Sequence, residues 1–349
     1  MHSPNLSIVI TAYNCAMYIE RTLLSAINQS DRDIEIVVID DGSTDDTAAI
    51  IKKYLPGDER IKYYYQTNRG IAATRNYALQ LVNGRYFTFM DGDDVIAPDF
   101  ARHVANTALG IELIIFDFEE QDPGGEMQVK RFDARLLQLA SENPVNTSFI
   151  IADKYPNLWA KAYSTHFVRS KNLSFFHTKT LEDMFFMLDI LMNKPVIAHI
   201  PYVSYSYLYV GSSISRRISL ATLTNRQDVV TYYMDKYIMV NIRQNTFFVT
   251  FWVNRIFMQF YLVLSSASLS GDRETAYRQT LSYIGLMLEK MRIAHLFKNR
   301  LDLLLQLRTN RARAVLCAYS FFRFWYKISK RFSYRLFAAI HSLMRFASR

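Results

Sequence analysis

Cysteine is scarce in this sequence, and long apolar runs are missing from it. The 349 residues include only two cysteines, Cys15 and Cys317, too few and too far apart for a disulfide framework. The most apolar late stretch, residues 246–264, is broken by Asn254 and Arg255, so it falls short of the roughly 18 to 20 apolar residues of a membrane-spanning helix. We therefore expect reduced thiols and no spanning segment.

Motifs of several common enzyme classes are absent as well. The sequence contains neither G-x-G-x-x-G nor G-x-x-x-x-G-K-[ST], so a nicotinamide fingerprint and a P-loop are both missing. It also lacks the G-x-S-x-G nucleophile elbow. The first residues, MHSPNLSIVIT, show no basic stretch followed by an apolar run, and we therefore expect no signal peptide and a cytoplasmic location.

Charge is plentiful but unevenly distributed. The formal net charge is +9, and the last 58 residues carry thirteen Lys or Arg against one acid, Asp302. The other 291 residues hold 28 basic and 31 acidic side chains and are close to neutral. Because 50% of the residues are apolar and there are only 11 Gly and 8 Pro, we expect a folded core and not a disordered chain.

The first 110 residues alternate between two patterns. Short runs rich in β-branched and aromatic residues predict strands over residues 6–11, 34–40, 61–65 and 86–90. The stretches between them have 3.6-residue periodicity and predict helices over residues 17–27, 47–54 and 71–81. This alternation is typical of βαβ units, so we predict an α/β fold with a doubly wound, mostly parallel sheet.

The rest of the chain is less regular at first and then helical. A fifth strand is predicted over residues 113–118, and an irregular stretch follows it to about residue 156. A helix over residues 181–192 and a strand-like pair around residues 196–209 come next. We predict an α/β domain over residues 1–217, with halves at 1–110 and 111–217. A helical C-terminal region is predicted over residues 218–349, and its basic tail begins at about residue 292.

Polar and acidic side chains follow the predicted strands at one edge of the sheet. Thr11 and Tyr13 end the first strand, Asp41 follows the second, and Asp91 and Asp93 follow the fourth. Ligands of open parallel sheets bind outside the carboxyl ends of the strands. Neighbouring buried acids are costly unless a cation or a hydrogen-bonding ligand compensates them. The sequence therefore predicts a binding site at this edge.

The segment Asp91-Gly92-Asp93-Asp94 is the most specific part of this edge. Two carboxylates at positions i and i+2, with a glycine between them that lets the backbone turn, can offer oxygen ligands to Mg²⁺ or Mn²⁺ beside a diphosphate. The alternative is an ordinary turn, in which Asp and Gly are common.

Other positions each have a functional and a structural interpretation. Asp41 is expected to accept a hydrogen bond from a nucleobase that lies against Tyr13, or else to cap the next helix. Arg75 suits phosphate oxygens, or else it is a solvated charge on a helix. Glu182 and Asp183 open a predicted helix, and the dipole of that helix favours acids in its first turn. The functional interpretation is that they supply the base that removes a proton from an acceptor hydroxyl.

Four motifs stand in order at the expected strand ends: SIVITAYNCAMYIERTLLSAINQS, EIVVIDDGSTDDT, NRGIAATRNYAL and GRYFTFMDGDD. Together they resemble family 2 of the GT-A glycosyltransferases. The resemblance covers roughly residues 5–215 and is strongest up to residue 100. It implies a GT-A fold and an inverting transferase that uses a nucleotide-sugar donor, usually UDP-linked, together with Mn²⁺ or Mg²⁺.

The resemblance also implies roles for individual residues. Donor contacts are expected from Thr11, Tyr13, Asp41, Arg75 and Asp91, and from Ser213, Ser215 and Arg216 in YSYLYVGSSISRR. The expected metal ligands are Asp93 and Asp91. Asp183 of the ED pair is the expected base, and the acceptor is expected near Glu182 and near Trp159 of LWAKAY. Three positions depart from the family pattern without an expected effect on ligation, namely Gly92, where Ser is commoner, and Arg69 and Thr74, where small residues are usual.

The expected reaction is a single displacement onto a glycan or lipid-linked glycan. Asp183 deprotonates the acceptor hydroxyl, and the metal at Asp93 offsets the charge of the departing nucleoside diphosphate. Two other functions compete with this one: a nucleotidyltransferase that makes the activated sugar, and a non-catalytic nucleotide-sugar-binding protein. A nucleotidyltransferase is disfavoured because its Gly-rich phosphate loop is missing from this sequence. A non-catalytic binding protein is disfavoured because both acidic pairs are intact.

The basic tail interleaves aromatic and cationic residues, as in FFRFWYK. Amphipathic helices of this composition lie at anionic membrane surfaces, so we expect a peripheral enzyme on the inner face of the cell membrane. The alternative is a helical subdomain that packs on itself or on a partner subunit in an oligomer. Nucleic-acid binding is not favoured, because charge alone supports it and no recognition module is visible.

Overall fold

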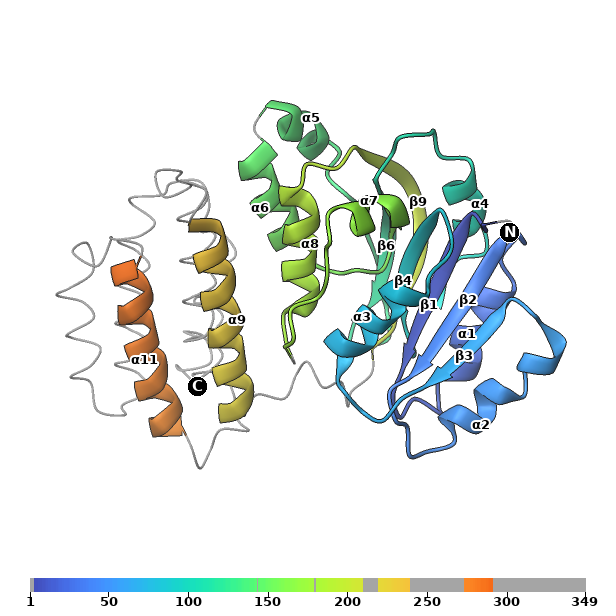
Figure 1. Cartoon of the computed structure of the whole chain (residues 1–349), viewed down its shortest axis with the longest axis horizontal. Coiled ribbons are helices and arrows are strands. Elements are labelled where there is room, and N and C mark those ends of the chain that lie inside the picture. Colours follow the sequence, from blue (N-terminus) through green and yellow to red (C-terminus); the bar gives the residue numbers. More distant parts are fainter. Residues whose placement is uncertain (1–2, 143, 179, 210–218, 239–272, 291–349) are drawn as a thin grey trace. The chain divides into compact units, whose positions relative to one another are not determined.

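The structure is a computed structural model that describes five stretches of the chain (Figure 1), namely residues 3–142, 144–178, 180–209, 219–238 and 273–290. The chain divides into two compact units, Met1–Ser213 and Ile214–Arg349. The expected donor residues Ser213, Ser215 and Arg216, and the basic tail, lie outside the described residues.

The first half of unit 1 is the predicted parallel sheet. Its strands stand in the order β3-β2-β1-β4 and are β1 (Leu6–Ala12), β2 (Ile34–Asp40), β3 (Ile61–Tyr65) and β4 (Tyr86–Asp91). The helices that connect them are α1 (Ile19–Ile27), α2 (Thr47–Lys52) and α3 (Ile71–Leu81). Figure 1 shows α3 on one side of these strands and α1 and α2 on the other. Both faces are therefore covered, which explains why every residue of β1 and β2 is buried.

The second half of unit 1 extends the same sheet with mixed pairing. The additional strands are β5 (Val95–Ile96), β6 (Leu113–Gln121), β7 (Met127–Lys130), β8 (Lys161–Ser164) and β9 (Ile197–Tyr207). The predicted fifth strand, β6, does not lie beside β4, because β8 lies between them and is antiparallel to both. β9 is parallel to β6, and β5 and β7 pair antiparallel to β9 and β6. The predicted α/β fold class is confirmed.

Two predictions for this half are wrong. The stretch expected to be irregular contains two helices, α5 (Arg135–Glu142) and α6 (Pro144–Lys154), the second of which begins with proline, a residue well suited to a first helical position. The expected strand pair around residues 196–209 is the single strand β9, which contains Pro201. Its register against β6 shifts after Phe116 and leaves Pro201 unpaired, as proline in a strand requires.

Short helices complete unit 1, and unit 2 is helical where it is described. Unit 1 also contains α4 (Phe100–Ala105), α7 (Thr165–Ser170) and the predicted helix α8 (Glu182–Met192). Unit 2 contains α9 (Leu220–Ile238) and α11 (Arg273–Lys290), whose side chains meet where Gln279 Nε2 donates to Gln227 Oε1 at 2.9 Å. None of the helices in the described stretches combines the length and the apolar character that crossing a membrane requires.

Candidate active site

The ends of β2, β1 and β4 lie side by side at one edge of the sheet. In the strand register, Ala12 of β1 pairs with Asp40 of β2, and Thr11 of β1 pairs with Asp91 of β4. Neighbouring strands are about 4.8 Å apart, so the acids that follow β2 and β4 are separated by about two strand spacings. The structure thus brings together the three strand ends on which the expected site depends.

At the end of β2, Asp41 is buried and nearly saturated with hydrogen bonds. Its Oδ1 accepts from Gln66 Nε2 at 2.7 Å and from the Arg69 backbone N–H at 2.8 Å. Its Oδ2 accepts from the Gly70 backbone N–H at 2.9 Å. Asp41 therefore fastens the loop that enters α3, and Oδ2 retains capacity for one more donor, such as a nucleobase N–H.

The neighbouring Asp40 stabilises a turn and does not cap α2. Its two oxygens accept from the Ser43 backbone N–H and the Tyr63 hydroxyl, both at 2.8 Å. The residue before α2 is Asp46, and its side chain makes no capping hydrogen bond. The capping interpretation of this acidic segment is therefore wrong for α2.

Tyr13 follows β1 with 44% of its surface exposed. The next residue, Asn14, has a positive φ of 48°, and its Oδ1 accepts from the Thr44 backbone N–H at 2.8 Å. This bond ties the loops after β1 and β2 together while the Tyr13 ring faces solvent, where a base can lie against it. Thr11, at 8% exposure, is buried in the strand before it.

The loop after β4 is held by side chains that the sequence motifs did not indicate. Thr22 Oγ1 lies 3.1 Å from Gly92 O and 2.8 Å from Asp94 O. The Tyr205 hydroxyl accepts from the Asp91 backbone N–H at 3.2 Å and donates to Asp94 Oδ2 at 2.8 Å. Contacts that span 70 to 114 residues of sequence leave no local signal by which they could be predicted.

Negative charge accumulates in this loop. Burial and the charge of Asp91 raise the pKa of Asp93 to about 6. Burial, Asp91 and Asp93 raise the pKa of Asp94 to about 8. These shifts mean that the loop destabilises its own ionised carboxylates, which is the condition that a bound cation relieves.

Gly92 is required by its neighbour Cys15. A Cβ atom at position 92 would lie 2.8 Å from Cys15 Sγ and 3.1 Å from Thr11 O. The buried thiol of Cys15 therefore occupies the space that the side chain of the commoner serine would need. This departure from the family pattern has a packing reason that the sequence alone did not reveal.

Arg75 joins the end of β4 to the start of α8. Its side chain is only 7% exposed, and its guanidinium contacts Asp91 Oδ1 at 3.2 Å and Glu182 Oε1 at 2.8 Å. The guanidinium also lies 5.8 Å from the ring centroids of Phe89 and Phe175. The solvated-charge interpretation of Arg75 is therefore wrong. Arg75 contacts both acidic motifs, and its contact with Glu182 spans 107 residues of sequence.

The expected base, Asp183, lies in the first turn of α8 and is partly buried. Leu181, the residue before the helix, has a left-handed φ of 63°, which is strained for a leucine and is typical of functional sites. Burial and the adjacent Glu182 raise the pKa of Asp183 to about 7, against the opposing charge of Arg75. A pKa near the working pH suits a general base.

Trp159 lies in a cluster of aromatic side chains from β6 and β9. Its ring is stacked on Tyr205 with the centroids 4.8 Å apart and on Tyr207 with the centroids 5.4 Å apart. Phe118 meets the same ring edge-on at 4.7 Å. Since the hydroxyl of Tyr205 also holds the loop after β4, this stack connects the expected acceptor wall with the expected metal loop. The role of Trp159 as a wall for a sugar stays a prediction.

The carboxylates of this loop fit a hard divalent cation. Within the described residues, no three His, Cys, Asp or Glu side chains are arranged to hold a metal by themselves. Mg²⁺ and Mn²⁺ sites in nucleotide enzymes often use only one or two carboxylates and take their other ligands from phosphate and water. The oxygen-only set of Asp91 and Asp93, with the raised pKa of Asp93, meets that requirement.

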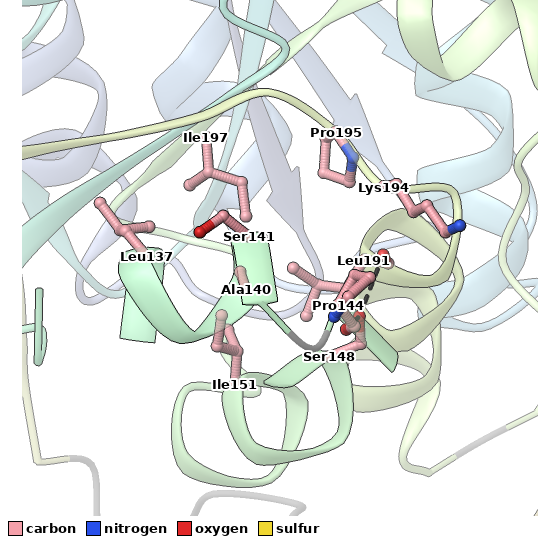
Figure 2. Close-up of a pocket in the computed structure, with 10 residues that line it drawn as sticks. All are labelled: Leu137, Ala140, Ser141, Pro144, Ser148, Ile151, Leu191, Lys194, Pro195 and Ile197. Atoms are coloured by element: carbon pink, nitrogen blue, oxygen red, sulfur yellow. Dashed lines mark hydrogen bonds between the residues drawn. The ribbon is translucent and has the colours of Figure 1, made fainter. Parts of the chain in front are cut away.

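A pocket of about 340 Å³ lies at the opposite end of α8 (Figure 2), and none of the expected site residues lines it. Its walls come from α5, α6, the end of α8 and the start of β9, and are mainly apolar. The hydroxyl of Ser148 lies within hydrogen-bonding distance of Pro144 O, at 2.7 Å, and of Leu191 O, at 3.1 Å. The titratable residue of its lining is Lys194, so the pocket offers no counterpart to the acidic site.

The chain is similar to several known proteins in sequence or in fold. In S. aureus TarS 1-349, solved in complex with UDP-GlcNAc, the fold matches with a TM-score of 0.62 at 17% identity, over 90% of this chain and 89% of that chain. The chain is 40% identical over 116 residues to an uncharacterized glycosyltransferase of Haemophilus influenzae, covering 33% of this chain and 46% of the relative. It is 29% identical over 226 residues to a Bacillus subtilis protein named as a glycosyltransferase, EpsH, covering 62% and 64%.

The mixed, mostly parallel sheet and its flanking helices thus have the GT-A fold. Residues 7–165 match the profile of glycosyl transferase family 2. The chain spans less than two thirds of the length of these two curated relatives.

Proposed function

We propose that this protein transfers a sugar from a nucleotide-sugar donor to a glycan acceptor with inversion at the anomeric carbon. The observation that carries the proposal is the contact of Arg75 with both Asp91 and Glu182. This contact sets the β4 acids, suited to a diphosphate-bound metal, beside Asp183, suited to an acceptor hydroxyl. A single displacement requires these two functions on opposite sides of one sugar.

The donor nucleoside is assigned to the ends of β1 and β2. The exposed ring of Tyr13 offers a stacking face for the base, and Asp41 Oδ2 offers the acceptor for a base N–H. The loop that Asp41 fastens through the backbone N–H groups of Arg69 and Gly70 gives this acceptor a fixed position. UDP is the nucleotide that we would test first, because the TarS complex contains UDP-GlcNAc.

The diphosphate is assigned to the end of β4. Asp93, with Asp91, would hold Mn²⁺ or Mg²⁺, which would offset the charge of the departing nucleoside diphosphate when bound. Arg75 is buried by its contacts with Asp91 and Glu182, so its direct contribution to the site is to orient these two acids. Contact between Arg75 and phosphate stays a prediction.

Asp183 is the proposed base. Its carboxylate takes the proton of the acceptor hydroxyl while that oxygen bonds to the anomeric carbon and the bond to the diphosphate breaks. The fixed start of α8, with strained Leu181 and Glu182 held by Arg75, restricts where the carboxylate can point. A lipid-linked glycan beside an anionic membrane is the proposed setting, and it rests on the basic tail.

The decisive experiment measures nucleoside diphosphate release from UDP- and GDP-sugars by the full chain, with and without Mn²⁺. Asp183→Asn should reduce release by about 10³-fold or more while donor binding by calorimetry stays within about twofold, because the loss of a catalytic base affects the transition state. Asp93→Asn should instead abolish the effect of Mn²⁺ on donor binding. The matched control is Asp99→Asn, whose carboxylate pairs with Arg102 on α4, and which should behave as wild type.

The same assay separates the rival functions. A nucleotidyltransferase would release pyrophosphate from a nucleoside triphosphate and a sugar phosphate. A non-catalytic binding protein would bind the nucleotide sugar and release nothing with any acceptor. Equal release by wild type and Asp183→Asn would reject Asp183 as the base.

A further inference from the structure

Lys161 is a charged side chain in the interior of unit 1 for which the proposed function has no role. It opens β8 and is 1% exposed. Its Nζ donates to Asn157 O at 2.5 Å, a neutral partner that leaves the ammonium charge uncompensated. Burial disfavours the charged form of a lysine, and a nearby anion would offset part of that effect.

The strand and helix geometry identifies such an anion. Lys161 and Tyr163 lie two residues apart in β8 and therefore on the same face of the strand. The Tyr163 hydroxyl lies 3.3 Å from Met187 Sδ. Met187 is four residues after Asp183 in α8, so these two residues share one face of the helix. The face of β8 that carries Lys161 is thus packed against the face of α8 that carries Asp183.

The electrostatics of the two faces agree with this packing. Burial lowers the pKa of Lys161 to about 7, and the charge of Asp183 opposes that decrease. The charge of Asp183 also raises the pKa of Tyr163, after the larger effect of burial. The charged groups that act most strongly on Asp183 are Glu182 on its own helix, Arg75 on α3 and Asp91 on β4. Lys161 thus lies on the face of β8 that packs against α8, within reach of the charge of Asp183.

We propose that Lys161 is a positioning residue for the base, whose buried ammonium keeps the Asp183 carboxylate ionised and directed toward the acceptor. This inference rests on the proposed function, in which Asp183 is the base. Arg75 is already bound to Asp91 and Glu182, so Lys161 supplies Asp183 with a cation that those acids do not share.

The first test is the pH dependence of kcat/KM for nucleoside diphosphate release at saturating Mn²⁺. Lys161→Met keeps the length of the side chain and removes its charge, so the acidic limb should move upward by about one pH unit. Donor affinity should stay within about twofold, and turnover should approach wild type well above the limb. Lys161→Arg should restore the position of the limb, and Lys154→Met, a partly exposed lysine of α6, is the matched control. A lower rate at every pH with an unmoved limb would mean that Lys161 is merely structural.

A second test does not depend on activity or on the folding of a Lys161 variant. In Asp183→Asn, which retains Lys161, the pKa of Lys161 followed by lysine-selective NMR should fall further below that of wild type, because its facing anion is gone. An unchanged Lys161 titration would overturn the proposal even if Asp183 proved to be the base. Conversely, a shifted titration in a protein that releases no nucleoside diphosphate would retain the Lys161–Asp183 pair and reject the proposed function.

Discussion

The two acidic clusters at the edge of the sheet differ in how their charges are satisfied. At the end of β2, the carboxylates of Asp40 and Asp41 accept five hydrogen bonds, three of them from backbone N–H groups. At the end of β4, burial and mutual repulsion raise the pKa of Asp93 and Asp94. The carboxylates of the first cluster are satisfied mainly by hydrogen-bond donors of the protein itself, whereas the carboxylates of the second repel one another.

This difference indicates two kinds of recognition. A carboxylate fixed by backbone donors has a set position and suits the selective recognition of a nucleobase. Carboxylates that repel one another suit a cation, because the bound charge removes the repulsion. Arg75 supplies part of that charge permanently, and in the proposed function a metal that binds with the donor would supply the rest.

Among the substitutions that test this difference between the two clusters, Arg75→Met should have the largest effect, which is on the stability of the fold. The substitution leaves Asp91 and Glu182 without their shared cation and should destabilise the fold by about 3–5 kcal/mol, the usual cost of breaking a buried ion pair. Urea unfolding followed by circular dichroism measures the loss. The control is Arg69→Met, an exposed side chain whose removal should change stability by less than about 0.5 kcal/mol. Equal effects of the two substitutions would contradict the role of Arg75.

The second effect is on the pH dependence of stability, through Asp94→Asn. The pKa of Asp94 is about 8 in the folded chain and about 3.9 when unfolded, so the folded state binds the proton more tightly. Wild-type stability is therefore full below about pH 4 and falls as the pH rises toward 8. Asparagine does not ionise, so the variant should gain on the order of 2 kcal/mol relative to wild type across that window.

Thermal unfolding in the presence of a chelator, at intervals from pH 4 to pH 8, measures this gain. Two melting curves that run parallel with pH would show that Asp94 carries no buried charge. Adding Mn²⁺ should narrow the gap at pH 8, because a bound cation stabilises the ionised loop of the wild type. Asp122→Asn, in an exposed turn, is the control and should follow the wild-type curve.

The sequence predicted the β2 and β4 regions better than the acceptor half, for a physical reason. Strands buried on both faces read as continuous apolar runs, so the predicted bounds of β2 and β3 match the structure and those of β1 and β4 differ by one residue. In the acceptor half, β9 is half-exposed and contains Pro201 at a register shift. Such a strand cannot be distinguished by pattern from two shorter ones.

The site shows the same division between local and long-range information. Residues that sit in contiguous motifs, such as Asp41, Asp93 and Asp183, were expected from the sequence. The contacts of Tyr205 with Asp91 and Asp94 were not, because they span 114 and 111 residues of sequence, and neither was the proposed role of Lys161. One signal was available for Lys161, which stands between two alanines in LWAKAY, since a lysine in an otherwise apolar strand is rarely buried without a partner.

The third prediction tests why the loop after β4 has glycine at position 92, where serine is commoner in the family pattern. Gly92→Ser would bring the new side chain against Cys15 Sγ and should destabilise the fold by about 1–3 kcal/mol, as overpacking usually does. Cys15→Ala makes room, so the double variant should recover most of the loss in a double-mutant cycle measured by urea unfolding. Additive effects of the two substitutions would contradict the steric account.

The smallest expected effect is at the end of β2, through Thr74→Ala. Thr74 Oγ1 accepts from Gln66 Nε2 at 3.0 Å and donates to Gly70 O at 3.0 Å, so it holds the amide that donates to Asp41. Its loss removes one neutral hydrogen bond and should weaken UDP binding by about 1 kcal/mol, roughly fivefold. Titration calorimetry with UDP measures the change, and Thr74→Ser, which keeps the hydroxyl, should bind as wild type.

This small expected value follows from the completeness of the β2 cluster. Two backbone N–H groups hold Asp41 independently of Gln66, so the carboxylate should keep most of its position in Thr74→Ala. A loss of 100-fold or more would mean that Gln66 itself touches the base and that the β2 cluster, like the β4 cluster, is completed only by its ligand. No loss would mean that the backbone donors alone fix Asp41, which would make the contrast between the two clusters sharper still.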